Sequence, residues 1–91
     1  MPKFVIERDM PGAGDLSQEQ LQEAAQISCG VLLEMGPRIQ WVQTYVTDNK
    51  MYCIYNAPDE AYIKEHASKS GFPADKISQV HAIFDPTTAE V

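Results

Sequence analysis

The alternation of apolar and polar residues along the chain predicts four β-strands. Residues 3–8 (KFVIER) and 39–47 (IQWVQTYVT) alternate and are rich in Val, Ile and aromatic residues, as half-buried strands are. Residues 50–56 (KMYCIYN) and 77–85 (ISQVHAIFD) have the same character, and Pro86 is expected to end the last strand. The two residues 48–49 (DN) between the second and third strands suit a tight hairpin turn.

A capping box and a repeating apolar stripe predict the first helix. Ser17 has the residue type of an N-cap, and Gln20 stands three positions later, as a capping box requires. Apolar and small residues then recur every three or four positions as far as Met35. Gly36 follows this stripe, so we expect the helix to end there.

A second helix completes a recognisable order of elements. It is predicted over residues 58–70, because Pro58 suits a first turn and Gly71 suits a helix end. The order strand, helix, strand, strand, helix, strand predicts an α+β fold of the ferredoxin-like βαββαβ type. In this fold a four-stranded antiparallel sheet carries both helices on one face. The length favours a single domain over residues 1–91.

The predicted hairpin register decides which side chains share a face of the sheet. Three cross-strand pairs should lie on one face: Tyr45 with Tyr52, Gln43 with Ile54, and Trp41 with Asn56. The other face is more uniformly apolar, so we expect it to lie under the helices: Val42, Thr44, Val46, Met51, Cys53 and Tyr55. An exposed patch then remains on the open face, formed by Trp41, Tyr45, Tyr52 and Ile54. Apolar patches of this kind mark interfaces, so we expect a homodimer through this face.

Composition and charge exclude several classes of partner. With 44% hydrophobic and 22% charged residues, the chain has an ordinary globular composition. Its net charge of −6 argues against binding to nucleic acid or to an anionic membrane. No apolar run is long enough to span a bilayer, and the first ten residues lack the apolar core of a signal peptide. We therefore expect a cytoplasmic protein whose Cys29 and Cys53 stay reduced.

Cys53 and His66 are the residues best suited by type to bind a ligand or to take part in a reaction. Strand alternation points Cys53 toward the helices, and helical spacing puts His66 on the buried side of the second helix. We therefore expect both to line one cavity between the sheet and that helix. Tyr55, Tyr62 and Ser70 should complete the lining.

Three interpretations of this pair follow from the residues alone. Cys53 and His66 could bind a soft metal ion with Glu7 as a carboxylate ligand, although no CxxC, HxH or HExxH spacing is present. They could instead be a buried thiol and a hydrogen-bonded core histidine. They could also line a small-molecule pocket in which His66 is a general base. The residues leave all three open, and no catalytic residue is assigned.

Four segments resemble a known family of small bacterial proteins. The segments MPKFVIER, QWVQTYVTDNKMYCIYNAPDE, KEHASKSGFPADKI and DPTTAE are similar to members of the domain of unknown function 4242 family, which are often named nickel-binding proteins. The resemblance implies a ferredoxin-like fold, a dimeric α/β-barrel assembly, and nickel or another divalent transition metal as cofactor. Cys53 and His66 match the family pattern, whereas Gln43 stands where related sequences carry His. The alternative function is a small-molecule binder, or a monooxygenase-like or isomerase-like protein of the same assembly.

Overall fold

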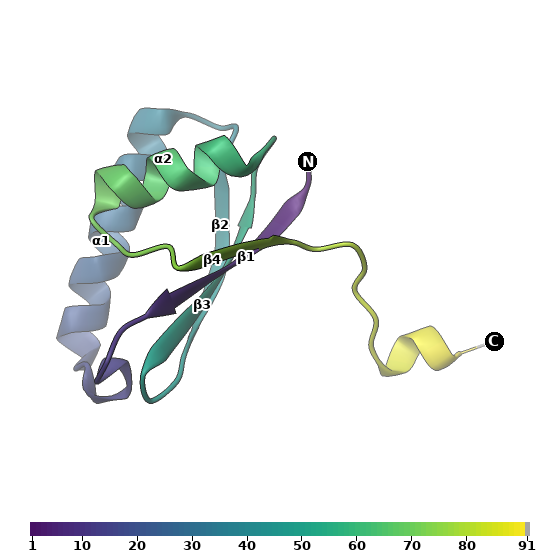
Figure 1. Ribbon diagram of the computed structural model, residues 1–91, viewed down its shortest axis with the longest axis horizontal. Helices are drawn as coiled ribbons and strands as arrows, with labels where there is room; N and C mark the ends of the chain where they lie inside the picture. The colour runs from purple at the N-terminus through teal and green to yellow at the C-terminus, as the bar shows by residue number, and fades with distance from the viewer. Residues whose placement is uncertain (91) are drawn as a thin grey trace.

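The computed structural model describes residues 1–90 and contains the predicted order of strands and helices (Figure 1). The elements are β1 (Lys3–Asp9), α1 (Gln18–Met35), β2 (Gln40–Val46), β3 (Lys50–Asn56), α2 (Glu60–Ser70) and β4 (Lys76–Gln79), with two 3₁₀ helices, η1 (Ala13–Asp15) and η2 (Pro86–Ala89). The sheet order is β2-β3-β1-β4, and every neighbouring pair is antiparallel.

Both helices cover the same face of this sheet and leave its other face open (Figure 1). This arrangement is the ferredoxin-like α+β fold, as the sequence predicts. Within residues 1–90, no helix is both long enough and apolar enough to cross a bilayer. Cys29 is an exposed free thiol and Cys53 a buried one.

The first helix begins and ends where its sequence signals predict. The Ser17 hydroxyl accepts a hydrogen bond from the backbone N–H of Gln20 at 3.1 Å, and the Gln20 side chain accepts one from the N–H of Ser17 at 2.9 Å. This capping box satisfies two backbone donors at the helix start. At the other end, Gly36 has φ of 88°, a conformation that favours glycine and stops the helix.

The second helix starts two residues later than predicted. Its N-cap is Asp59, whose carboxylate accepts a hydrogen bond from the backbone N–H of Tyr62 at 3.3 Å. Asp is a strong N-cap residue, so the helix begins at Glu60, and Pro58 lies before the cap instead of in the first turn. The buried side of α2 is the predicted one, with Ile63, His66 and Ala67 facing the core.

The pairing of β1 with β3 builds the core. Ile6 pairs with Cys53 and Phe4 with Tyr55, and all four side chains are buried beneath the helices. Alternate residues of the same strands, such as Val5 opposite Ile54, point to the open face. Ile63 of α2 joins this core from the helix layer and is 1% exposed.

A β-bulge in β2 places Trp41 on the opposite face of the sheet from the predicted one. Tyr45 pairs with Tyr52 and Gln43 with Ile54 as predicted, but the register shifts between Gln43 and Trp41. Trp41 therefore lies opposite Tyr55, not Asn56, and turns toward the helices. Val42 is the extra residue of the bulge and is 48% exposed, so its predicted place under the helices is also wrong.

The last strand is shorter than predicted because its partner ends. β4 pairs with β1 from Lys76 opposite Glu7 to Gln79 opposite Phe4, and one further hydrogen bond joins the Val80 N–H to the Lys3 carbonyl. β1 begins at Lys3, so no strand remains to pair with residues 81–85. Residues 81–90 are all exposed and form an arm that leads away from the sheet (Figure 1), and His81 lies on this arm.

The capping box of α1 gives the first testable prediction. Ser17→Ala removes the acceptor for the Gln20 N–H, and we expect it to lower the free energy of unfolding by about 1 kcal/mol. Urea denaturation followed by circular dichroism measures this loss. Ser68→Ala, on the exposed surface of α2, is the matched control and should change stability little. Equal losses in the two variants would contradict the capping role.

Candidate binding pocket

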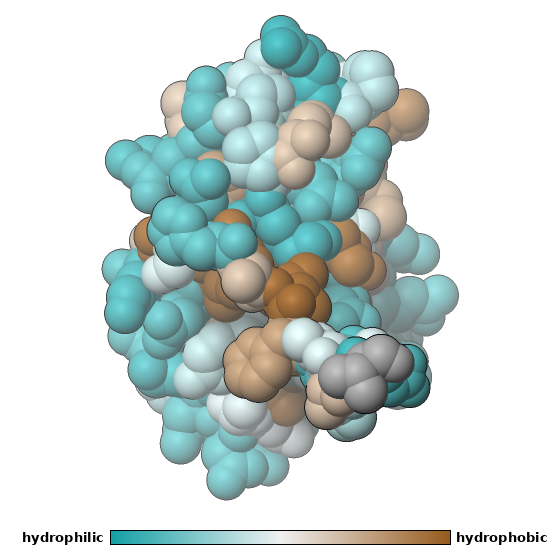
Figure 2. Space-filling view, turned by 90° about the vertical axis from the view of Figure 1, so that its right-hand side faces the viewer, coloured by the Kyte–Doolittle hydropathy of each residue, from teal (hydrophilic) through white to brown (hydrophobic). Residues whose placement is uncertain are grey.

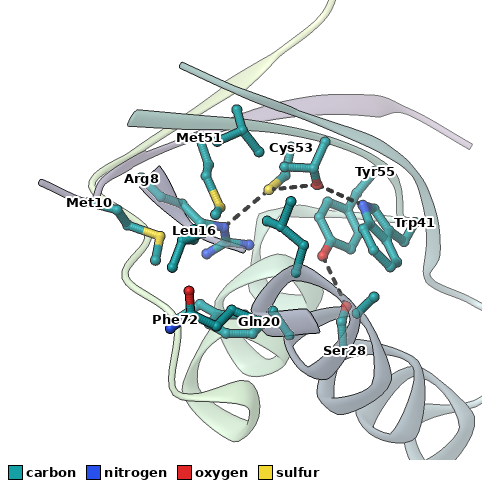
Figure 3. Close-up of a pocket in the computed structure, with 15 residues that line it drawn as sticks. Arg8, Met10, Leu16, Gln20, Ser28, Trp41, Met51, Cys53, Tyr55 and Phe72 are labelled. Atoms are coloured by element: carbon teal, nitrogen blue, oxygen red, sulfur yellow. Dashed lines mark hydrogen bonds between the residues drawn. The ribbon is translucent and has the colours of Figure 1, made fainter. Parts of the chain in front are cut away.

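A cavity of about 350 Å³ lies between the sheet and α1 (Figure 3). It exists because small side chains on the helix face larger ones on the sheet. The small side chains are those of Ala24, Ala25 and Ser28, and the larger ones are those of Trp41, Met51 and Tyr55. Most of the lining is apolar, and the polar groups are few, which is the usual character of a small-molecule site.

A chain of hydrogen bonds fixes the sheet side of the pocket (Figure 3). The indole Nε1 of Trp41 donates to the Thr44 hydroxyl at 2.9 Å, and this hydroxyl donates to the sulfur of Cys53 at 3.1 Å. Arg8 Nε donates to the same sulfur at 3.3 Å. The Cys53 sulfur thus accepts two hydrogen bonds and lies next to a cation.

Arg8 is a buried cation that lines the pocket. Its side chain is 2% exposed, and its Nη1 donates to the backbone carbonyl of Pro73. The guanidinium carbon lies 5.8 Å from the centre of the Phe72 ring, within cation–π range. Among residues 1–90, no acidic side chain forms an ion pair with Arg8. Arg8 is absent from the predicted site residues, although position 8 continues the buried alternation of Phe4 and Ile6.

His66 is a buried, hydrogen-bonded core histidine. It is 1% exposed, with its Nε2 at 3.1 Å from the Ser28 hydroxyl and 3.4 Å from the Ser70 hydroxyl. Its ring centre lies 5.1 Å from that of Tyr55. Burial lowers the pKa of His66, the contact with Ser28 opposes this shift, and the charge of Arg8 lowers the pKa further. The imidazole is therefore neutral at pH 7.

Cys53 and His66 both point into the layer between sheet and helices, as predicted, but they do not line the same cavity. Cys53 and Tyr55 line the pocket under α1. His66 lies outside its lining, against Ser28 and Tyr55, and Tyr62 and Ser70 are likewise absent from the lining. Only Tyr55 of the three predicted pocket residues contributes to the pocket.

The open face of the sheet carries three of the four predicted patch residues. Tyr45, which is 56% exposed, pairs with Tyr52, and Ile54 pairs with Val5 on the side away from the helices. Figure 2 shows apolar side chains near the centre of the side from which the C-terminal arm projects, with hydrophilic ones around them. Trp41 is missing from the patch because of the bulge.

Comparison with known proteins places the chain in a family. A family model described as "Nickel responsive protein SCO4226-like" matches residues 4–80. The chain belongs to this family. The crystal structure of SCO4226 from Streptomyces coelicolor A3(2) is similar in fold, with a TM-score of 0.75 and 20% sequence identity over 90% of this chain and 99% of that one. A search of curated proteins gave no match. The label domain of unknown function 4242 stays a prediction.

Membership of the nickel responsive protein SCO4226-like family raises the question whether this chain could hold a metal ion. The predicted ligands are not brought together. Glu7 points to the open face, where its carboxylate lies 3.8 Å from Lys50 Nζ and 3.9 Å from Lys76 Nζ. This follows from alternation, because Cys53 pairs with Ile6, the neighbour of Glu7.

The immediate surroundings of Cys53 and His66 also disfavour a cation. The Cys53 sulfur accepts hydrogen bonds from a guanidinium and a hydroxyl, and His66 Nε2 faces two hydroxyl groups. No cluster of three or more His, Cys, Asp or Glu side chains suited to a metal ion occurs in the described part of the chain, residues 1–90. The donors present in one chain therefore do not fit a metal centre.

The lowered pKa of His66 predicts a loss of stability in mild acid. The unfolded chain takes up a proton on this histidine near its ordinary pKa of about 6.5, whereas the folded chain does so only at lower pH. The contribution of His66 to stability is therefore complete above about pH 6.5 and decreases as the pH falls below that value. Urea unfolding at pH 7.5, 6.5 and 5.5 measures this decrease.

His66→Gln should make that pH dependence shallower, since the glutamine does not titrate. The chain has two histidines, so His81→Gln on the exposed arm is the matched control and should keep the wild-type pH dependence. An unchanged slope in His66→Gln would contradict the assignment.

Proposed function

We propose that the protein is a homodimeric binding protein whose ligand is a small, mostly apolar organic molecule. The observation that carries this proposal is the cavity of about 350 Å³ beneath α1, lined mainly by apolar side chains with a few polar groups. Pockets of about 300–1,000 Å³ with this kind of lining are typical of small-molecule sites. The family description connects relatives with a response to nickel, but the donor groups of this chain support an organic ligand better than a metal ion.

The open face and the C-terminal arm support the homodimer. Tyr45, Tyr52 and Ile54 form an apolar strip that the helices do not cover. On the arm, Ile83 is 71% exposed and Phe84 is 83% exposed. A chain of this length buries a smaller share of its surface on folding than a larger domain does, so burial of both regions against a second copy would add apolar area. We therefore propose that the open faces of two chains pack together and that each arm lies against the partner.

We also propose a cytoplasmic location for the protein. The free thiols of Cys29 and Cys53 support it, because an exposed thiol such as that of Cys29 persists in a reducing compartment.

A charge on the open face should break the proposed dimer. Tyr45→Glu would place a carboxylate in the apolar strip, where burial against the partner would desolvate it. Multi-angle light scattering at micromolar concentration should give the mass of two chains for the wild type and of one chain for the variant. Leu33→Glu, 85% exposed on α1, is the matched control and should stay dimeric. A monomeric wild type would end this part of the proposal.

A larger side chain on α1 should block the proposed pocket. N-phenyl-1-naphthylamine, a neutral apolar probe, should fluoresce when added to the wild type. Ala24→Leu fills pocket volume and should reduce the signal at least fivefold, while Ala61→Leu on the exposed side of α2 should leave it unchanged. Equal fluorescence in all three proteins would show that the probe binds elsewhere and would overturn the pocket assignment.

A further inference from the structure

We infer that the ligand of the pocket is a small apolar monoanion, a monocarboxylate, and that Arg8 binds its charged group. The inference rests on the proposed function, since it takes the cavity beneath α1 as the ligand site. It adds the chemical class of the ligand, which neither the family description nor the shape of the cavity specifies.

The first observation is that no carboxylate within residues 1–90 forms an ion pair with Arg8. The side chain is 2% exposed, and burying an unpaired charge is strongly unfavourable. Its sequence neighbours Glu7 and Asp9 are acidic, but both form ion pairs with Lys50 on the other face of the sheet. The chain has 13 acidic and 7 basic residues, yet within residues 1–90 none of the acidic ones pairs with this buried cation.

The second observation is that hydrogen-bond donors remain on the guanidinium. Nε donates to the Cys53 sulfur and Nη1 to the carbonyl of Pro73. A guanidinium has five N–H donors in a planar fork, so others are left for a ligand, and a carboxylate matches that fork with two parallel bonds. The present partners are a sulfur, a carbonyl and an aromatic ring, and none of these groups is a carboxylate. Burial raises the pKa of the nearby Tyr55 phenol, and the charge of Arg8 lies close enough to oppose that rise.

The third observation is the shape of the lining around Arg8. In Figure 3, Arg8 lies at one end of the pocket, and Trp41 lies at the other. α1 contributes Leu21, Ala24 and Ala25 to the lining. A ligand with its carboxylate at Arg8 would therefore extend an apolar chain or ring toward Trp41. Arg8 is the single Lys or Arg of the lining. It can therefore balance the one negative charge of a carboxylate, but not the two negative charges of a phosphate ester.

The competing explanation is that Arg8 is a structural residue. Its contacts with Phe72 and Pro73 tie the segment after α2 to the sheet. A purely structural arginine would give no preference between a charged probe and its neutral analogue. This difference separates the two explanations without any variant.

The experiment compares octanoate with octanamide, which has the same length but no charge. The chain has one tryptophan, and it lines the pocket, so the fluorescence of Trp41 in the full-length protein reports binding of either probe. We expect octanoate to bind the wild type at least tenfold more tightly than octanamide. In Arg8→Gln the preference should fall below twofold, and in Arg8→Lys part of it should remain.

Arg38→Gln is the matched control, because Arg38 is the other arginine of the chain and is exposed. It should keep the wild-type preference. If Arg8→Gln does not fold, the larger thermal stabilisation of the wild type by octanoate than by octanamide decides the question.

Each remaining outcome has a definite meaning. Equal affinities of the two probes for the wild type would overturn the monoanion and leave the apolar pocket in place. A preference that persists in Arg8→Gln would overturn the assignment to Arg8. If neither of these probes nor N-phenyl-1-naphthylamine binds, the proposed function and the inference both fall.

Discussion

The pairing register of β1 with β3 is the constraint on which the rest of the structure depends. With Ile6 opposite Cys53, every second side chain of both strands turns toward the helices. A slip of β1 by one residue against β3 would move every side chain of β1 to the opposite face. Glu7 would then enter the core beside Cys53, and Ile6 would be exposed on the open face. The pocket and the apolar strip are therefore two consequences of one register, and neither could be moved without the other.

The volume of the pocket comes from a mismatch between the two layers that enclose it. α1 presents alanines and a serine where the sheet presents Trp41, Met51 and Tyr55. Larger side chains at Ala24 and Ala25 would fill this space. The hydrophobic pattern of the helix would be the same with small or large apolar side chains at these positions. The apolar stripe thus specifies the helix and its buried side, while the sizes of the side chains decide whether a cavity remains.

The sequence predicts most of the fold because its signals are local. The capping box at Ser17, the alternation of the strands and the two-residue turn each act over a few residues, and the structure confirms them. The errors arise where the outcome depends on a distant partner. The bulge at Val42 reverses the face of Trp41, and β4 stops at Gln79 because β1 has no residue left to pair. The apolar residues of 80–85 favour a strand by residue type, but residue type cannot supply a neighbouring strand.

The candidate site was harder to predict because its chemistry depends on pairing in space. Cys53 and His66 stand out by residue type, yet their partners are Arg8, Thr44 and Ser28, which come from three other elements. Binding of a divalent cation requires negative or neutral donors that converge on one point. The guanidinium of Arg8 lies beside the Cys53 sulfur, and the sulfur and His66 Nε2 have separate hydrogen-bond partners, so they do not form such a point. The same guanidinium that repels a cation attracts an anion. The buried neighbours of position 8 on its strand are apolar. The positive charge of Arg8 therefore favours an anionic ligand over a metal cation.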